Sequence, residues 1–156
     1  MKFVVIIAIV ALALFFANRY FSNKKLSAEN IAISKAFLEQ NKANEGVVET
    51  ASGLQYEVLE KGDGYDFPKA NSTVKVHYHG TLLDGTVFDS SVERAKPISF
   101  PLNQVIKGWT EGVQLMVVGD KFKFFIPSEL AYGDRATGDI TPGSLLIFEV
   151  ELLEIQ

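Results

Sequence analysis

The sequence has no cysteine among its 156 residues. This absence excludes disulfide bonds, zinc sites built from thiolates and catalysis by a thiol nucleophile. It does not identify a compartment, because oxidising compartments also contain proteins without cysteine.

Basic side chains are scarce in the greater part of the chain. All 19 acidic residues lie after Leu26, against 11 of the 15 basic residues, so this part carries a net charge of −8. A surface that binds phosphates needs the opposite charge. We therefore expect no nucleic-acid partner.

Long apolar runs are absent except for one at the start of the sequence. Residues Phe3 to Ala17 are apolar without interruption, and a helix extended to Phe21 would be about 28 Å long. This length is close to the hydrocarbon thickness of a bilayer, and Arg19 and Tyr20 suit its interface. We expect residues 1–21 to be a transmembrane anchor that contacts the membrane through residues 3–21.

A cleaved signal peptide is the alternative interpretation of this segment. Ala11-Leu12-Ala13 resembles a cleavage site, but cleavage there would leave three large apolar residues at the new terminus. The uncleaved anchor is therefore favoured. Arg19, Lys24 and Lys25 follow the apolar run, and this charge pattern places the rest of the chain in the cytoplasm.

Residues 22–52 read as a linker with a short helix. Ser22 to Lys25 would leave the membrane, Ser27 would cap a helix from Ala28 to about Ala43, and Gly46 would stop it. The apolar stripe of this helix is narrow. A spacer is therefore favoured over a dimerisation helix, which would be too short.

From Gly53 onward, apolar and polar residues alternate with a period of two. Such alternation predicts strands with one buried and one exposed face, as in an antiparallel sheet. The expected strands lie at 54–58, 74–79, 121–126 and 146–152. One short helix is expected from about Lys107 to Leu115, with Trp109, Val113 and Met116 on one side. The fold class is therefore α+β, a twisted antiparallel sheet wrapped over one short helix.

The turn Asp84-Gly85 joins two strands that bring Tyr78 close to Phe88 and Asp89. Tyr78 is either a core residue or a pocket residue whose hydroxyl bonds to Asp89. Asp89 is either an exposed strand carboxylate or part of an aromatic pocket, and in a pocket it needs donors such as Tyr78 and Arg94. An apolar peptide suits such a pocket better than a metal or a phosphate.

Other candidate sites have weaker support. His77 and His79 share a strand face and could seed a metal site, but two solvated histidines are the favoured interpretation. A triad of Ser90, His77 and Asp89 lacks the nucleophile-elbow context. The loop from Ala131 to Gly143 is either a crossover or a flap over a ligand.

Several spaced motifs then resemble one family. They are Val76 to Ser91, Val105 to Gly112, Ala131-Tyr132-Gly133, Leu145 to Leu153 and, upstream, Phe37 to Gly64. In this order they resemble the FKBP-type peptidyl-prolyl cis-trans isomerases, in the bacterial branch similar to the macrophage infectivity potentiator. The resemblance implies an FKBP-like fold for residues 53–156, preceded by the transmembrane helix and the linker helix.

The resemblance also implies a site. Trp109 would form the pocket floor, with Asp89 and Arg94 as polar members and Ile140 at the flap. The implied walls are Tyr78, Phe88, Val105, Ile106, Tyr132 and Phe148. Ile98 stands where many members have Phe, and the flap segment 134–139 is more charged than in many relatives, so substrate preference is expected to differ.

The implied activity is rotation of X-Pro bonds during protein folding, without a cofactor or a metal. The expected partners are proline-containing polypeptides, and macrolide inhibitors of the family. A membrane-tethered chaperone that binds peptides without catalysis is the alternative. One short helix replaces the longer dimerisation region of this branch, so a monomer is expected. The expected location is the inner membrane as a single-pass protein. The family analogy places the catalytic domain in the periplasm, whereas the charge pattern favours the cytoplasm.

Overall fold

One unbroken helix, α1 (Lys2–Asn41), begins the computed structural model, which describes residues 2–156. The prediction of two helices separated by a polar exit is therefore wrong. No glycine or proline occurs before Gly46, so nothing in the sequence interrupts the helical hydrogen bonds. Ser27 consequently lies inside the helix instead of capping it. Gly46, with a φ of 85°, lies in the turn after the helix.

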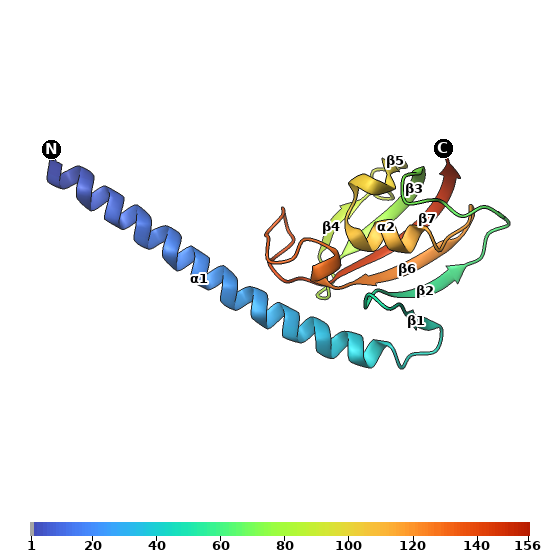
Figure 1. Cartoon of the computed structure of the whole chain (residues 1–156), viewed down its shortest axis with the longest axis horizontal. Coiled ribbons are helices and arrows are strands. Elements are labelled where there is room, and N and C mark those ends of the chain that lie inside the picture. Colours follow the sequence, from blue (N-terminus) through green and yellow to red (C-terminus); the bar gives the residue numbers. More distant parts are fainter. Residues whose placement is uncertain (1) are drawn as a thin grey trace.

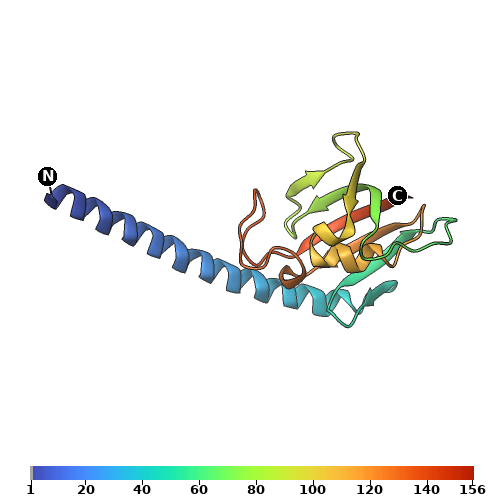
Figure 2. The same cartoon turned by 45° about the horizontal axis from the view of Figure 1, so that its top comes forward.

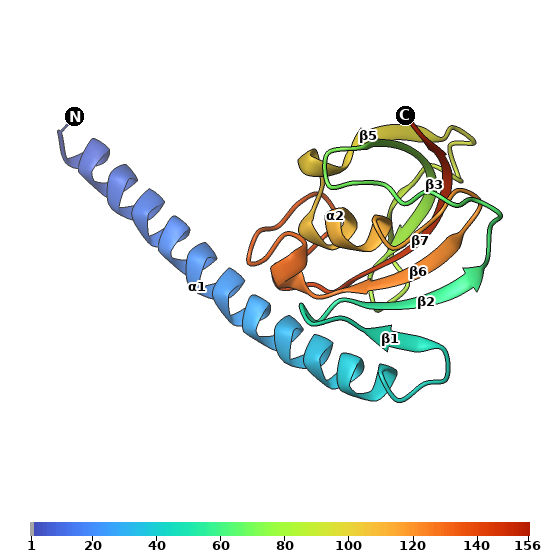
Figure 3. The same ribbon diagram turned by 45° about the vertical axis from the view of Figure 1, so that its right-hand side comes forward.

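A seven-stranded antiparallel sheet forms the framework of the domain after α1. Its strand order is β1-β2-β6-β7-β3-β4, and β5 pairs with β3. The strands are β1 (Val47–Glu49), β2 (Gln55–Glu60), β3 (Thr73–Thr81), β4 (Val87–Ser90), β5 (Ile98–Pro101), β6 (Lys121–Ile126) and β7 (Leu146–Ile155). The second helix, α2 (Lys107–Val113), lies across one face of this curved sheet (Figures 1 and 3). Short 3₁₀ turns occur at Leu102–Gln104 and Ser128–Leu130.

The predicted α+β class is confirmed. The four predicted strands are present, and the predicted helix is α2, which ends two residues earlier than expected. The short strands β1 and β5 were not predicted, because three or four residues give too little alternation to detect. β1 also lies inside the segment interpreted as a linker and pairs with β2.

The core lies between the sheet and α2. Trp109, Val113 and Met116 are at most 4% exposed, as their spacing predicted. Alternate residues of β3 are buried from Val74 to Gly80, so Tyr78 points inward. The inner face of β3 therefore packs into the same core as α2.

The second half of α1 packs on the domain, and the first half does not (Figure 2). Ser27, Ser34 and Asn41 are buried at intervals of seven residues, which places them on one face of the helix. The Asn41 Nδ2 group donates a 2.9 Å hydrogen bond to Gln55 Oε1. The rings of Phe37 and Phe125 lie 5.8 Å apart. The helix therefore continues rigidly from the apolar segment onto the domain.

Candidate active site

A cleft of about 440 Å³ opens between α2 and the sheet. Its lining combines residues from β3, β4, β5, β7, the start of α2 and the segment after β6. These residues are Tyr78, Asp89, Phe100, Gln104, Val105, Ile106, Trp109, Ala131, Tyr132 and Phe148. Distant parts of the sequence thus build one largely apolar hollow.

Trp109 lies at the centre of the aromatic side chains. Its ring centroid is 5.3 Å from Tyr78, 5.7 Å from Phe100 and 5.2 Å from Phe148, each in an edge-to-face arrangement. Phe88 contacts Phe148 in the same way at 5.2 Å. Such interlocked rings hold each other in place, so the cleft has rigid apolar walls.

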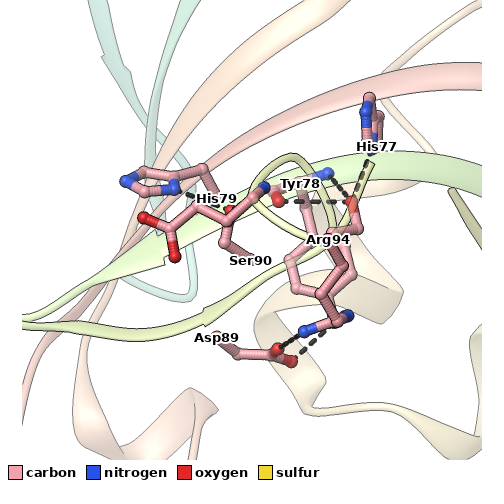
Figure 4. Close-up of polar contacts among 8 residues, drawn as sticks. His77, Tyr78, His79, Asp89, Ser90 and Arg94 are labelled. Atoms are coloured by element: carbon pink, nitrogen blue, oxygen red, sulfur yellow. Dashed lines mark hydrogen bonds and ion pairs between the residues drawn. The ribbon is translucent and has the colours of Figure 1, made fainter. Parts of the chain in front are cut away.

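One carboxylate, Asp89, lies among these rings. The Tyr78 hydroxyl donates to Asp89 Oδ2 at 2.5 Å, and Arg94 Nη1 donates to Asp89 Oδ1 at 2.5 Å. Arg94 Nη2 also donates to the Tyr78 hydroxyl oxygen at 3.1 Å, which closes the triangle (Figure 4). The antiparallel pairing of β3 and β4, with Gly80 opposite Asp89, brings these groups together.

This network sets the protonation states of the cleft. Burial alone would raise the pKa of Asp89, but the hydrogen bonds from Tyr78 and Arg94 and the charge of Arg94 outweigh it and lower that pKa. Burial, together with the neighbouring Asp89, raises the pKa of Tyr78. At neutral pH, Asp89 is therefore ionised and Tyr78 is protonated. Neither group is suited to exchange a proton with a substrate near pH 7.

One side-chain N–H and one backbone N–H at the cleft have no hydrogen-bond acceptor within residues 2–156. The buried Trp109 indole N–H has no hydrogen-bond partner there. The backbone N–H of Ile106, the residue before α2, also donates to no group in this part of the chain. A free N–H at the rim of an apolar cleft can donate a hydrogen bond to the carbonyl oxygen of a bound peptide.

Seven of the eleven candidate site residues line the cleft: Tyr78, Asp89, Val105, Ile106, Trp109, Tyr132 and Phe148. Phe88 packs behind Phe148, and Arg94 holds Asp89 from the solvent side. Ile98 packs on the core beside β3, and Ile140 is buried in the core cluster, so neither lines the cleft.

Phe100, Gln104 and Ala131 line the cleft but were not predicted. Phe100 follows Ile98 by two residues on β5 and therefore shares its side of the strand. That spacing was an available signal, whereas Gln104 lies in an irregular turn that no pattern marks.

The two histidines lie on the other face of β3 from Tyr78. His77 Nδ1 lies 2.6 Å from Ser91 Oγ, and His79 Nδ1 lies 2.9 Å from Ser90 Oγ (Figure 4). Across residues 2–156, no group of three or more metal-binding side chains comes together. The histidines are therefore satisfied by neighbouring serines and take no part in the cleft.

Comparison with known families gives two matches along the chain. Residues 64–153 match the model of the FKBP-type peptidyl-prolyl cis-trans isomerase. Residues 10–58 match the domain amino terminal to FKBP-type peptidyl-prolyl isomerase. The second match covers most of α1 together with β1, the region that precedes the cleft in sequence.

Individual relatives agree with these matches. The chain is 58% identical over 132 residues to the FKBP-type peptidyl-prolyl cis-trans isomerase FkpA of Aeromonas hydrophila, which covers 85% of this chain and 49% of that protein. It is 45% identical over 141 residues to the outer membrane protein MIP of Legionella longbeachae, covering 90% and 60%. The chain thus spans about half the length of such relatives.

A solved structure shares the fold. The crystal structure of FkpA from Escherichia coli superposes with a TM-score of 0.86 at 42% sequence identity, covering 94% of this chain and 70% of that one. The likeness therefore includes α1 as well as the sheet domain.

Proposed function

The chain belongs to the FKBP-type peptidyl-prolyl cis-trans isomerase family, and we propose that it accelerates the rotation of X-Pro bonds in polypeptides during folding. One observation carries this proposal. A rigid aromatic cleft surrounds a single carboxylate that is already paired with Tyr78 and Arg94. Such a site can hold a proline ring, but it offers no free acid, base or nucleophile.

Bond rotation needs none of those groups. The barrier to rotation about an amide is about 18–20 kcal/mol, because resonance gives the C–N bond partial double-bond character. The planar amide is more charge-separated than the twisted amide. An apolar cleft therefore disfavours the planar ground state relative to the twisted transition state.

We assign the roles as follows. Trp109, Tyr78 and Phe148 hold the proline ring, and Phe88 supports Phe148 from behind. The Ile106 N–H donates to a substrate carbonyl. The Tyr132 hydroxyl provides a second hydrogen bond. Asp89 shapes the field around the twisting amide, and Arg94 fixes its position. Val105 completes the wall, while Ile98 and Ile140 support it from behind.

The test is a protease-coupled cis–trans assay on a short Leu-Pro peptide. The expected result is acceleration at micromolar protein, lost in Trp109→Ala and reduced in Asp89→Val. A refolding assay on a chain limited by proline isomerisation runs beside it. If the protein assists refolding but does not accelerate isomerisation of the peptide, the alternative function, a chaperone that binds without catalysis, would replace the isomerase function.

We further propose that α1 anchors the protein in the inner membrane as a single-pass helix. An 18-residue window of α1 has a mean hydropathy of 1.9 and none of it is buried in the protein. The family analogy favours a periplasmic domain. The inward face of α1 beyond Phe21 is occupied by the chain's own domain, which supports a monomer. Light scattering in detergent tests the monomer, and a reporter fused after Gln156 tests the orientation.

Macrolide inhibitors of the family are proposed as ligands of the same cleft. Trp109 is the only tryptophan of the chain and forms the cleft floor. Its fluorescence is therefore expected to change on titration with a macrolide.

A further inference from the structure

The loop 131–143 forms a rim of the cleft and is also one of the parts of the domain that contact α1. Ala131 and Tyr132 line the cleft. From α1, the Ser27 hydroxyl donates to Asp134, and Asn30 Nδ2 donates to the Pro142 carbonyl at 2.8 Å. The loop therefore ties the cleft to one particular turn of the helix.

Gly143 makes this contact close. Its φ is 73°, and a Cβ atom added there would lie 2.4 Å from the Ser27 carbonyl oxygen. Only glycine permits such an approach, so the backbones of loop and helix pack directly against each other. Together with the hydrogen bonds, this packing fixes the loop along the helix axis.

The contact lies just beyond the apolar segment. Ser27 lies six positions after Phe21, which corresponds to about 9 Å along a helix. Tyr132 is two residues from Asp134, which adds at most about 7 Å. The headgroup layer accounts for roughly 5–7 Å of this distance. If the hydrocarbon ends near Phe21, the rim of the cleft lies within about 10 Å of the membrane surface. Figures 1 and 3 show this loop on the side of the domain that faces the first half of α1.

A bilayer is the occupant that suits the first half of α1. Its large apolar side chains are 52–68% exposed on every side of the helix: Val5, Ile6, Ile7, Ile9, Val10, Leu12, Leu14, Phe15 and Phe16. Pairing with a second copy would need only a stripe of such residues. Apolar residues all round a helix of bilayer length fit lipid instead.

We propose that the cleft acts on proline-containing segments that lie at the membrane surface, such as the parts of membrane proteins next to their spanning helices. This inference rests on the proposed isomerase activity and the anchor. A substrate held at the same surface meets the cleft at a high effective concentration, whereas a polypeptide far from the bilayer does not.

The experiment uses full-length protein in vesicles of phosphatidylcholine and phosphatidylglycerol. A Leu-Pro peptide is coupled to a lipid through flexible Gly/Ser linkers of about 3 or about 12 residues, and the free peptide is the reference. Effective concentration falls as roughly the −3/2 power of linker length, so the short linker is expected to give about eightfold faster isomerisation.

A spacer variant reverses this preference. Inserting about 18 helix-forming residues after Phe21 adds five turns, which moves the domain about 27 Å outward without rotating it. The short linker can no longer reach the cleft, so the long linker is expected to become the better substrate. The free peptide should react equally with both proteins.

The loop contact has its own test. Asn30→Ala is expected to reduce the preference for the short linker and to leave the free-peptide rate unchanged. Glu29→Ala, one residue earlier and exposed, is the matched control and should preserve the preference.

The outcomes are distinguishable. No acceleration of the free peptide would refute the isomerase function. Normal acceleration of the free peptide with equal rates for both linkers would overturn the surface-substrate inference. Failure of the protein to enter vesicles, or cross-linking of two copies through their apolar helices, would overturn its membrane basis.

Discussion

Replacing Tyr78 by Phe removes one hydroxyl from the cleft and leaves the aromatic ring in place. The variant loses the 2.5 Å hydrogen bond to Asp89 and the acceptor of a 3.1 Å hydrogen bond from Arg94. Because the Tyr78 ring is only 4% exposed and packs on Trp109, a Phe ring should keep the same position. The substitution therefore tests the polar network and not the packing.

The size of the effect follows from the exposure of Asp89. Hydrogen bonds to charged groups contribute about 1.5–3 kcal/mol, but the Asp89 side chain is 44% exposed, so the loss should be near about 1 kcal/mol. At an m-value of about 1–3 kcal/mol/M, this corresponds to a decrease of roughly 0.3–1 M in the urea midpoint of unfolding. Trp109 fluorescence in detergent provides the measurement. If Asp89 shapes the field at the substrate, kcat/KM should fall by up to about tenfold.

The pH dependence has a definite sign. The folded state lowers the pKa of Asp89, so its stabilisation is present above the unfolded value of about 3.9 and is lost as pH falls through the folded value. Tyr78→Phe weakens this stabilisation. The difference between the variant and the parent should therefore be full at pH 7 and smaller near about pH 3.

The control is Tyr65→Phe, which removes a hydroxyl from a tyrosine that is 94% exposed and should change neither stability nor activity. An equal loss of stability for Tyr78→Phe at both pH values would refute the electrostatic explanation. An unchanged urea midpoint at pH 7 would show that the network contributes nothing to folding.

Two further predictions concern packing at the cleft and at the helix. In Gly80→Ala the new Cβ would lie 2.7 Å from the Phe88 ring and 2.8 Å from the Phe148 ring, so both rings must move. Overpacking of this kind costs about 1–3 kcal/mol of stability, measured by urea unfolding. Because the displaced rings belong to the cleft wall, kcat/KM in the peptide assay should fall even if the loss of stability is near about 1 kcal/mol. In Asn41→Ala the buried Gln55 side chain loses the donor of a 2.9 Å hydrogen bond. The free energy of unfolding in urea should fall by about 1–3 kcal/mol, while peptide isomerisation stays normal. An unchanged urea midpoint would mean that the packing of α1 on the domain does not depend on this contact.

The fold was predictable wherever one residue pattern covered a whole element. The buried residues of β3 alternate over nine positions, and the inward side of α2 follows from Trp109, Val113 and Met116. The continuity of α1 was missed because polar residues after an apolar run resemble a membrane exit. A helix has no reason to end there, however, unless glycine, proline or a competing cap interrupts it.

The site divides along a similar physical line. Tyr78 and Asp89 could be brought together from sequence because a tight turn sets the register of β3 and β4, and the hydrogen bond between them is present. The spacing of Phe100 from Ile98 indicated its side of β5, but no local turn places it in the cleft. That placement depends on the pairing of Phe100 with Val74 of β3, across a connection that contains β4. Local geometry is thus encoded in a few neighbouring residues, whereas contacts across the sheet depend on pairings that only the complete fold selects.

The contact between α1 and the loop 131–143 also depends on the complete fold and could not be predicted from the sequence. Ser27 and Gly143 are both ordinary in sequence, one a polar residue in a helix and the other a loop glycine. Only their direct backbone packing reveals that the cleft rim is fixed beside the end of the apolar segment. Since a rigid helix transmits position along its axis, the proposed anchor would make the length between Phe21 and Ser27 set the distance of the cleft from the bilayer. Under the proposed surface activity, that spacing would determine which prolines the protein reaches, independently of the side chains in the cleft.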